Sequence, residues 1–483
     1  MTTASNNKHK YRLLPFNFRN LGSHYIIVSE TGRFHKILRE DIIRLIRREI
    51  SPSEDIFLDL KAKDILCLEY SQEIVDVWAA KYRTKKKHIF DKPSLHMIVA
   101  THRCNQKCKY CHASASSEGK DISIETIKKC VDFILRESST YIKIEFQGGE
   151  PTLNFKIVKA CVEEFKDRAL SNNKIVEFVL CTNLYDINNS IKQYCCDNNI
   201  QISTSLDGPD ILHDSCRLSA DGKPTHHKVI ENINDLKSNY KIYPSALLTV
   251  TNKNVDKLFD VINHYKATGF SSIFIRSLNP FGRAGGGSED LAYPYDYFIK
   301  KYIDALEYII EINKNGHFFV EEYASILLTK ILTPLNSGYV DLLSPTGAGI
   351  SCLIYEINGD IFVSDEARMR ERVTHDKRYK VGNVIKNSYN ECIESAIMKK
   401  IVESSVIESI PGCAWCAYAP YCGHDPIRNY QLFNDEVGFR PNDPMCKLNT
   451  TTFDYLFSKI FSDNDSLRIF WSWVKRNESE IKQ

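Results

Sequence analysis

The sequence predicts an α/β protein built around an open, partial (β/α)6 barrel, with a small α+β module before it and a cysteine-rich extension after it. Strand-like apolar runs alternate with amphipathic helical segments over residues 94–315. Residues 11–85 instead read as strands followed by helices, and residues 316–450 are rich in turn residues and cysteines. Six strand–helix repeats fall short of the eight in a closed barrel, so we expect an open sheet.

Composition argues against several classes of protein. The chain has 483 residues, of which 43% are hydrophobic and 26% charged, which suits a folded chain of roughly two to four domains. Its 63 Lys and Arg nearly balance 61 Asp and Glu, which disfavours a nucleic-acid coat and a polybasic membrane binder. No run of about 18 apolar residues occurs, and the first residues hold no apolar signal segment. We therefore expect a cytoplasmic protein without a nucleic-acid or membrane partner.

Residues 11–85 are the expected N-terminal module. Turn residues separate three short strand-like runs, and apolar positions at i, i+3 and i+4 indicate three helices after them. The strands are expected at 16–22, 24–29 and 32–37, and the helices at 39–49, 53–63 and 72–82. This order indicates a compact, winged-helix-like unit. A basic run from Arg83 to His88, followed by Pro93, is interpreted as a linker.

The barrel follows over residues 94–315. Its strands are expected at 94–100, 141–147, 174–182, 200–206, 244–251 and 271–278, with helices between them such as 123–137, 154–170 and 255–269. Strands that are each followed by a helix form a parallel sheet with right-handed crossovers. Chemistry in such a sheet belongs at the carboxyl ends of the strands.

The alternation stops after residue 315. Residues 316–450 contain the second group of cysteines, and residues 451–483 end in an amphipathic helix expected at 466–483. Clustered thiols in a reducing cytosol more often bind metal or do redox chemistry than form disulfides.

The first cysteine group begins where the first barrel strand ends. Cys104, Cys108 and Cys111 have the spacing C-x3-C-x2-C on one loop. A structural zinc site uses four protein ligands. Three thiolates suit a [4Fe–4S] cluster with one iron left open, and that iron can bind a substrate or cofactor.

With Tyr110 before the last cysteine, this loop resembles that of the radical S-adenosylmethionine (SAM) superfamily. Later segments match the superfamily in the expected order, namely QGGEP, TN and STSLDGP after the second, third and fourth strands, over roughly residues 94–315. Each segment alone could be a turn or a helix cap. The resemblance implies a set of SAM contacts: Gly148, Gly149 and Glu150 at the amino group, Asn183, Ser203, Ser205 and Asp207 near the ribose and methionine, Arg217 at the carboxylate, and Tyr110 near the adenine.

The resemblance also implies a reaction. An electron enters the cluster and cleaves SAM to methionine and a 5′-deoxyadenosyl radical, which removes a hydrogen atom from an unactivated C–H bond. The electron would come from a donor protein such as flavodoxin or ferredoxin.

The second cysteine group has the spacing C-x2-C-x5-C followed by a distant cysteine. Its members are Cys413, Cys416, Cys422 and Cys446. Zinc is an alternative for four such thiols. After a radical SAM barrel, the pattern resembles the SPASM extension, which carries auxiliary [4Fe–4S] clusters. The resemblance implies that these four cysteines hold the outer auxiliary cluster.

The inner auxiliary cluster of the SPASM pattern lacks most of its ligands. Only Cys352 is present. The sequence is equally compatible with Cys352 as a ligand of the inner cluster and as a buried structural thiol. Asp365 and Asp425 stand where further cysteines are expected, and oxygen donors suit a soft cluster poorly. We therefore expect one auxiliary cluster. In sulfatase-maturing relatives a carboxylate at the position of Asp365 acts as a base. The alternative for Asp365 is a helix cap or a salt bridge to Arg368 or Arg370.

The whole chain most resembles the B-type His-Xaa-Ser system radical SAM maturases. The segments FNFRNLGSHYIIVSETGRF, RCNQKCKYC, IEFQGGEPTLNF, SDEAR and CAYAPYCGHDPIRNY carry this resemblance, although a cysteine is expected in place of Asp425. It implies a ribosomally made precursor peptide with His-Xaa-Ser repeats, a paired second radical SAM maturase, and a module at 11–85 that binds a leader peptide by strand addition.

Other functions remain open at this point. The nearest enzyme alternative is a formylglycine-generating anaerobic sulfatase maturase. An RNA-modifying radical SAM enzyme fits the near-neutral charge less well. The non-enzymatic alternative is a metal-binding interaction protein with zinc at the thiols, and residues 11–85 could also be a DNA-binding winged helix.

Overall fold

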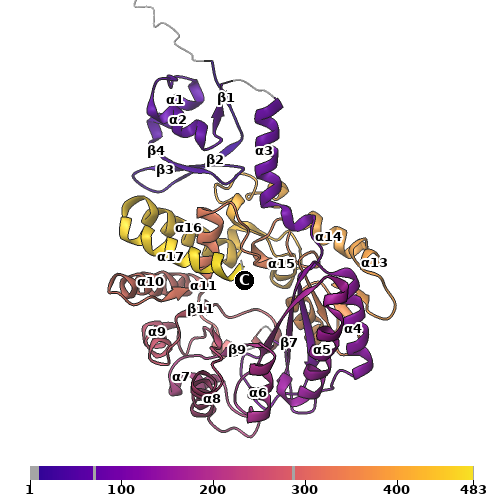
Figure 1. Ribbon diagram of the computed structural model, residues 1–483. Helices are drawn as coiled ribbons and strands as arrows, with labels where there is room; N and C mark the ends of the chain where they lie inside the picture. Colours follow the sequence, from indigo (N-terminus) through magenta and orange to yellow (C-terminus); the bar gives the residue numbers. More distant parts are fainter. Residues whose placement is uncertain (1–9, 69–71, 285–288, 482–483) are drawn as a thin grey trace, which may run out of the picture.

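A ten-stranded sheet runs through the body of the protein. The computed structural model describes residues 10–68, 72–284 and 289–481. The strand order is β12-β11-β10-β9-β8-β7-β6-β13-β14-β15, and the strands fan out beneath the N-terminal module (Figure 1). The strands are β6 (Leu95–Thr101), β7 (Tyr141–Gly148), β8 (Ile175–Cys181), β9 (Gln201–Ser205), β10 (Ser245–Thr249), β11 (Ser272–Arg276), β12 (Val320–Glu321), β13 (Cys352–Tyr355), β14 (Asp360–Phe362) and β15 (Lys380–Asn383).

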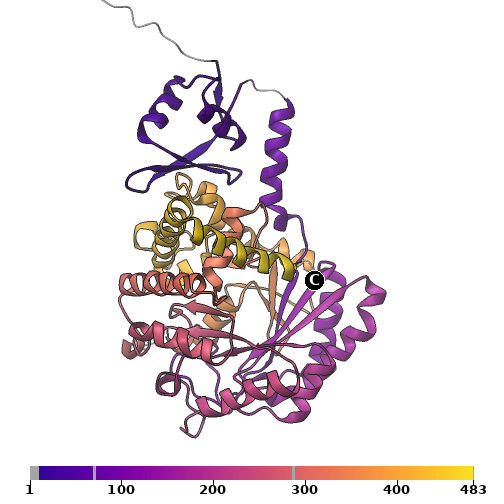
Figure 2. The same cartoon turned by 60° about the vertical axis from the view of Figure 1, so that its left-hand side comes forward.

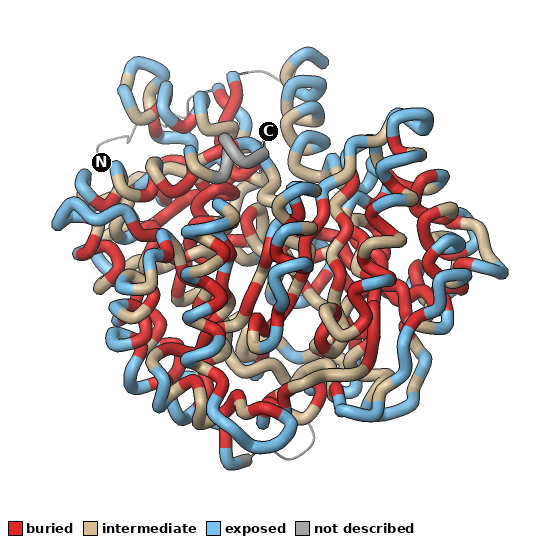
Figure 3. The backbone as a smooth tube through the Cα atoms, turned by 60° about the horizontal axis from the view of Figure 1, so that its bottom comes forward, coloured by how far each residue is buried: buried red, intermediate tan, exposed pale blue. Residues whose placement is uncertain are grey.

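The six expected barrel strands are β6 to β11, and they pair in parallel in sequence order. The open α/β barrel is therefore confirmed. The connecting helices are α4 (Ile124–Glu137), α5 (Phe155–Arg168), α6 (Asn189–Asp197), α7 (Asp210–Cys216), α8 (His226–Asn239) and α9 (Leu258–Ala267). In α4, Ser123 caps the N-terminus, and Ile127, Val131 and Ile134 bury one face of the helix. Burial is concentrated on the strands and the inner faces of the helices (Figure 3).

The sheet is longer than the six strands that the periodicity predicts. At one edge β12 pairs in parallel with β11, and at the other β13 pairs in parallel with β6 and begins an antiparallel meander. These strands have two to four residues and every one of their residues is buried except Lys380. Such short runs carry no alternation that a sequence pattern could detect. The division expected at residue 316 therefore does not coincide with a break in the sheet.

A bulge lies at the point where the first cysteine loop leaves the sheet. The register between β6 and β7 shifts between Val99 and Thr101. A bulge bends its strand and redirects the chain that follows. The three cysteines thus begin directly beyond the carboxyl end of the central strand β6.

The N-terminal module contains a three-stranded antiparallel sheet of order β2-β3-β4. Its elements are β1 (Arg12–Leu13), β2 (Phe16–Asn20), β3 (Tyr25–Ser29), β4 (Phe34–Ile37), α1 (Arg39–Arg47), α2 (Asp55–Ala62), β5 (Leu66–Cys67) and α3 (Gln72–Lys85). The expected three strands and three helices are all present. Helix α3 stands beside the module and leads down to the body (Figures 1 and 2).

Helices of the C-terminal third complete the body and support the module. They are α10 (Tyr295–Lys314), α11 (Glu322–Leu332), α12 (Asp365–Thr374), α13 (Tyr389–Ile393), α14 (Ala396–Ser405), α15 (Pro426–Phe433), α16 (Pro444–Ser462) and α17 (Asn464–Ile481). The module's sheet lies on α16 and α17 (Figure 2), and the ring of Phe34 meets that of Phe457 edge-on at 5.1 Å. Helix α16 crosses the boundary expected at residue 451. Residues 482–483 of the expected last helix lie outside the described residues. Among the helices described, none has both the length and the apolar content needed to cross a bilayer.

Candidate functional site

A cavity of ≈ 590 Å³ opens at the carboxyl ends of the barrel strands. This is the edge of the sheet at which the fold places chemistry. Most of the site residues expected from the sequence line it: Cys104, Cys108, Tyr110, Cys111, Gly148, Gly149, Asn183, Ser203, Ser205, Arg217, Cys352 and Asp365. Glu150 and Asp207 lie behind the wall.

The three-cysteine loop is fixed by backbone hydrogen bonds to segments on both sides of it. The amide of Cys104 donates to the carbonyl of Ser116 at 2.8 Å, and the amide of Lys109 donates to that of Cys216 at 3.0 Å. Burial is the main cause that raises the pKa of the Cys104 thiol to about 12, and Glu150, Cys108 and Cys111 contribute to the same rise. The thiols are therefore near enough to one another to interact electrostatically.

Two glycines let the end of β7 pack against this loop. A Cβ on Gly149 would lie 2.0 Å from the carbonyl oxygen of Arg103, next to Cys104. Gly148 has a φ of +126°, and its Cβ would lie 2.3 Å from the carbonyl oxygen of Thr101. Any side chain at these positions would displace the loop, which explains the need for glycine.

Tyr110, Asp207 and Arg217 form a buried hydrogen-bonded chain beneath the loop. The Tyr110 hydroxyl donates to the Asp207 carboxylate, and Arg217 Nη1 donates to the Tyr110 oxygen at 2.9 Å. Burial raises the pKa of the Cys108 thiol to about 11, and the Arg217 guanidinium offsets part of this rise. Arg217 lines the cavity, and its Nε is buried without a hydrogen-bond partner, so it keeps a donor for a ligand. Asp207 acts from behind by holding Tyr110.

Glu150 joins the ends of β7 and β8. Its carboxylate accepts hydrogen bonds from Thr182 Oγ1 at 2.7 Å, from the Asn183 amide at 2.8 Å and from Thr152 Oγ1 at 2.8 Å. The side chain is 1% exposed. In this arrangement Glu150 positions Asn183, whose amide side chain lies at the cavity beside Asn105. Its expected contact with the SAM amino group stays a prediction.

Asp365 lies on the cavity wall as the first residue of α12. Ser364 caps this helix through the amide of Ala367. Asp365 Oδ1 accepts a hydrogen bond from Arg368 Nε at 2.9 Å and lies 2.8 Å from Arg368 Nη2. Arg370 pairs instead with Asp376. The salt bridge to Arg368 thus exists at a position that also faces the cavity, and the role of Asp365 as a base stays a prediction.

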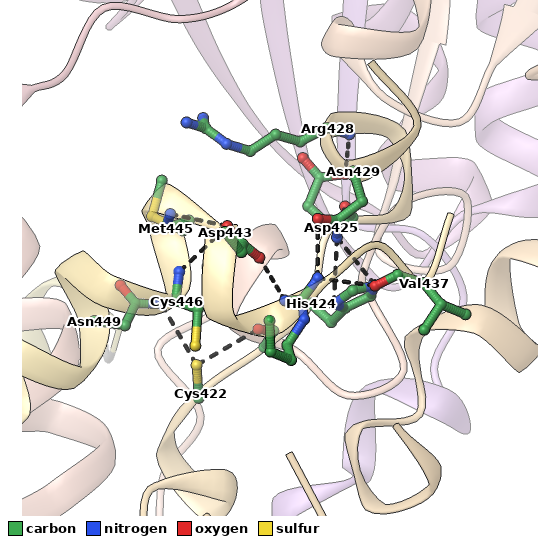
Figure 4. A network of polar contacts seen from close by, with 12 residues as sticks. Cys422, His424, Asp425, Arg428, Asn429, Val437, Asp443, Met445, Cys446 and Asn449 are labelled. Atoms are coloured by element: carbon green, nitrogen blue, oxygen red, sulfur yellow. Dashed lines mark hydrogen bonds and ion pairs between the residues drawn. The ribbon is translucent and has the colours of Figure 1, made fainter. Parts of the chain in front are cut away.

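The four cysteines of the second group gather where a loop meets the N-terminus of α16. The Cys422 sulfur accepts from Asn449 Nδ2 at 3.4 Å, and Asp443 Oδ1 accepts from the amide of Cys446 at 3.3 Å. The sulfurs of Cys422 and Cys446 point toward one another (Figure 4). Burial is the main cause that raises the pKa of Cys413 to about 12, and the other three thiols contribute to the same rise. A cavity of ≈ 100 Å³ borders three of the four cysteines.

The comparisons with known proteins agree with this geometry. The model of the radical SAM superfamily matches residues 98–275, which run from within β6 to within β11 and include the three-cysteine loop. The chain contains a radical SAM domain. The match implies a SAM-binding [4Fe–4S] cluster. The three thiols fit that group, because they are soft donors on one loop beside an open cavity.

The radical SAM domain and its flanks have relatives among described proteins. The chain is 26% identical over 387 residues to a cysteine-type anaerobic sulfatase-maturating enzyme of Clostridium novyi, covering 77% of this chain and 96% of that protein. It is 22% identical over 348 residues to the antilisterial bacteriocin subtilosin biosynthesis protein AlbA of Bacillus subtilis, covering 70% and 68%. An uncharacterized protein of Methanocaldococcus jannaschii is 33% identical over 186 residues, which span 38% of this chain and 63% of that protein.

Solved radical SAM structures share the fold. A structure of anSMEcpe with bound AdoMet has a TM-score of 0.65 and 21% identity, covering 78% of this chain and all of that one. Streptococcus suis SuiB bound to precursor peptide SuiA has a TM-score of 0.56 and 14% identity, covering 89% and 98%. At these identities the likeness concerns the fold.

The donor set for a third cluster does not fit. Cys352 is 1% exposed and its sulfur contacts the carbonyl of Val363 at 3.4 Å. Asp425 caps α15 by accepting from the amides of Ile427 and Arg428. One thiol among carboxylates is a poor site for a soft cluster. No group of three or more His, Cys, Asp or Glu side chains in the described ranges could hold a single metal ion.

The sequence patterns missed several polar residues of the cavity. Arg276, Asp341 and Glu366 line both the large cavity and the smaller one beside the second cysteine group. Arg276 ends the sixth barrel strand, so the rule that chemistry lies at strand ends could have found it. Asp341 lies outside the barrel in a segment with no recognisable motif, whereas Glu366 belongs to the SDEAR segment, of which only Asp365 was singled out.

Proposed function

We propose that this protein is a radical SAM enzyme that removes a hydrogen atom from a ribosomally made precursor peptide and so installs a modification or cross-link. One observation carries the proposal: the three-cysteine loop, most of the expected SAM contacts and Asp365 share one cavity of ≈ 590 Å³. When bound, SAM and the [4Fe–4S] cluster supply a 5′-deoxyadenosyl radical. The other residues of the cavity would bind SAM and the peptide, orient them and exclude water from the radical.

The wall of the cavity offers matched groups for SAM. Arg217 holds a free Nε donor for a carboxylate, and a planar guanidinium suits that target. Ser203 and Ser205 add hydroxyls at the end of β9. Tyr110 is 4% exposed and is held by Asp207, so its ring can provide a fixed apolar surface for an adenine. These assignments apply the SAM contacts implied by the family resemblance to the residues that line the cavity.

The N-terminal module supports a peptide as substrate. Its sheet has β2 and β4 as edge strands, and an edge strand offers unpaired backbone groups to an extended peptide. The module packs directly on helix α16, which carries Cys446 of the second thiol group, since Arg19 pairs with Asp454 of this helix. A leader peptide bound to the module would hold the rest of the precursor close to the part of the protein that contains the cavity. We propose a precursor with His-Xaa-Ser repeats, a paired second maturase, and flavodoxin or ferredoxin as electron donor.

A sulfatase maturase is the second candidate. The observation in its favour is that Asp365 faces the cavity, at the position where such enzymes use a base. Against it stand the ion pair of Asp365 with Arg368 and the missing ligands of the inner cluster. The alignment with the Clostridium novyi enzyme spans most of both chains, so sequence similarity alone does not separate the two candidate functions. An assay of which peptide is modified separates them.

The test uses anaerobically reconstituted protein with dithionite and SAM. We expect 5′-deoxyadenosine, and a mass change in a small peptide encoded beside the gene. A mass change in a sulfatase-derived peptide with cysteine or serine at its centre would favour the second candidate. A colourless protein that holds zinc would contradict both and favour the metal-binding interaction protein.

A further inference from the structure

An arginine whose guanidinium has no hydrogen-bond or ion-pair partner among the described residues lies in the wall of the large cavity. Arg276 is the last residue of β11, and its side chain borders the large cavity and the smaller one beside the second thiol group. Within the described ranges its guanidinium forms no hydrogen bond and no ion pair, although Glu366, Asp341 and Asp365 act on it electrostatically. Its guanidinium carbon lies 5.6 Å from the centre of the Phe274 ring. Arginines in such enclosed positions are almost always paired. Because the guanidinium of Arg276 has no such partner in the described ranges, its N–H donors are available for a ligand.

The other arginines of the cavity are already engaged. Arg368 is 1% exposed and pairs with Asp365. Arg217 donates to Tyr110 and to Gln106. Arg217 keeps only its Nε free, so Arg276 differs from these two arginines in that none of its guanidinium nitrogens is hydrogen-bonded to a described residue.

Two carboxylates share both cavities with Arg276. Asp341 and Glu366 line the same walls. Burial is the main cause that raises the pKa of each, and repulsion between carboxylates adds to it, while Arg276 lowers both. Asp425 also acts on this pair and Arg428 partly offsets it. The site thus combines one free donor group with carboxylates that have lost most of their hydration.

The charges decide which ligand fits. A ligand carboxylate would be attracted by Arg276 but repelled by Asp341 and Glu366. A ligand cation would be attracted by the two carboxylates but repelled by Arg276. A neutral peptide group matches both sides, because it presents a carbonyl acceptor and an N–H donor side by side. Hydrogen bonds to charged groups are among the stronger ones in proteins.

We propose that Arg276, Asp341 and Glu366 form a subsite that binds the main chain of the peptide at the residue to be modified. Arg276 donates to a carbonyl oxygen of the peptide, and a carboxyl oxygen accepts an amide N–H. The inference rests on the proposed function and deepens it. Because both cavities border the subsite, it holds the peptide between the two cysteine groups. Its contacts are independent of side chains, so sequence selection is left to the rest of the peptide.

The test measures the binding of acetyl-Gly-Gly-Gly-amide, a probe that offers little beyond a main chain, by equilibrium dialysis against full-length reconstituted protein loaded with SAM. Arg276→Gln should weaken binding by about tenfold, which corresponds to the loss of one hydrogen bond from a charged donor. Arg276→Lys keeps the charge and should recover part of the loss. Arg136→Gln is the matched control, because Arg136 is an exposed arginine that pairs with Glu137 on α4.

The formation of 5′-deoxyadenosine without any peptide separates two failures. Its absence from the wild-type protein contradicts the proposed function. If it persists in the wild type and in Arg276→Gln while both bind the probe equally, only the subsite is overturned. Tighter binding of glutarate than of the tripeptide amide would also overturn it, since a carboxylate site would then be present. A wild-type protein that does not bind the tripeptide counts against it too, because main-chain recognition is open to any peptide.

Discussion

Arg19 of the N-terminal module and Asp454 of α16 are joined by two hydrogen bonds of 2.5 and 2.6 Å. The same carboxylate accepts a hydrogen bond from Tyr418 at 2.6 Å, and Tyr418 lies between the thiols Cys416 and Cys422 in the sequence. Asn17, also on β2, donates to the carbonyl of Cys416. The module's edge strand is thus bonded to the segment that carries three of the four thiols of the second group.

The first prediction concerns this connection. Arg19→Ala should loosen the module from the body by about 1 kcal/mol, because a two-pronged pair that is about a third exposed is worth more than a simple surface ion pair. Hydrogen exchange of the β2 amides should become faster. Arg468→Ala is the control, since Arg468 pairs with Asp465 on an exposed helical face. Equal exchange rates in both variants would mean that other contacts hold the module.

The second prediction concerns the glycines under the three-cysteine loop. In Gly149→Ala the new methyl would lie 2.0 Å from the carbonyl of Arg103, so the loop must move. We expect reconstituted protein to lose about four irons, the content of one cluster. Gly222→Ala is the control, because a Cβ there meets nothing within 4 Å. Its φ of +84° makes alanine strained at this position, whereas Gly149 has no positive φ, so the control tests backbone strain without a steric clash. A full iron content in Gly149→Ala would show that the loop tolerates the shift.

The third prediction concerns the number of clusters. With one thiol among carboxylates at the inner position, reconstituted protein should carry about eight irons, which is two four-iron clusters. Cys352→Ala should leave that number unchanged. About twelve irons in the wild type, with a loss in Cys352→Ala, would contradict the assignment. One zinc with about four irons would place zinc at the second thiol group.

The fourth prediction concerns acid stability. His96 is 1% exposed, its Nδ1 accepts from the Tyr355 hydroxyl at 2.8 Å, and its Nε2 donates to the carbonyl of Pro93 at 3.2 Å. Burial lowers its pKa to about 3. The folded state therefore binds a proton less readily than the unfolded state, so this contribution to stability is complete above about pH 6.5 and is lost as the pH falls toward 3.

His96→Asn should flatten this dependence, by up to about 1.4 kcal/mol per pH unit between pH 6 and 4. The measurement is the free energy of unfolding in urea at several pH values, compared with His227→Asn, which alters an exposed histidine. Identical pH profiles in the two variants would show that His96 does not contribute.

The barrel and the three-cysteine loop could be predicted because their signals are local. Strands such as β7 are long enough to show a pattern, and a C-x3-C-x2-C loop is a specific arrangement of soft ligands. The strands β12 and β13, which flank the six barrel strands, could not be predicted, because their few residues are all buried and show no alternation. Their place depends on pairing with distant strands.

The roles of individual carboxylates depended on three-dimensional contacts. The sequence places Glu150 and Asp365 at strand and helix ends. Only the structure shows that Glu150 accepts from the amide of Asn183, just after β8, and that Asp365 pairs with Arg368. Arg276 was missed because a lone arginine at a strand end resembles any solvated charge. Its interest arises from the cavity it enters and from the lack of a partner among the described residues.

The central claim is that Cys104, Cys108 and Cys111 hold a cluster that cleaves SAM, and its most direct test is 5′-deoxyadenosine formation by reconstituted protein with dithionite. Each thiol is one of three protein ligands on the loop, so Cys104→Ala should lose the activity. Cys67→Ala is the matched control, because Cys67 is a buried thiol of the N-terminal module. We expect 5′-deoxyadenosine from the wild type and from Cys67→Ala and none above background from Cys104→Ala. Equal turnover in Cys104→Ala would contradict the account.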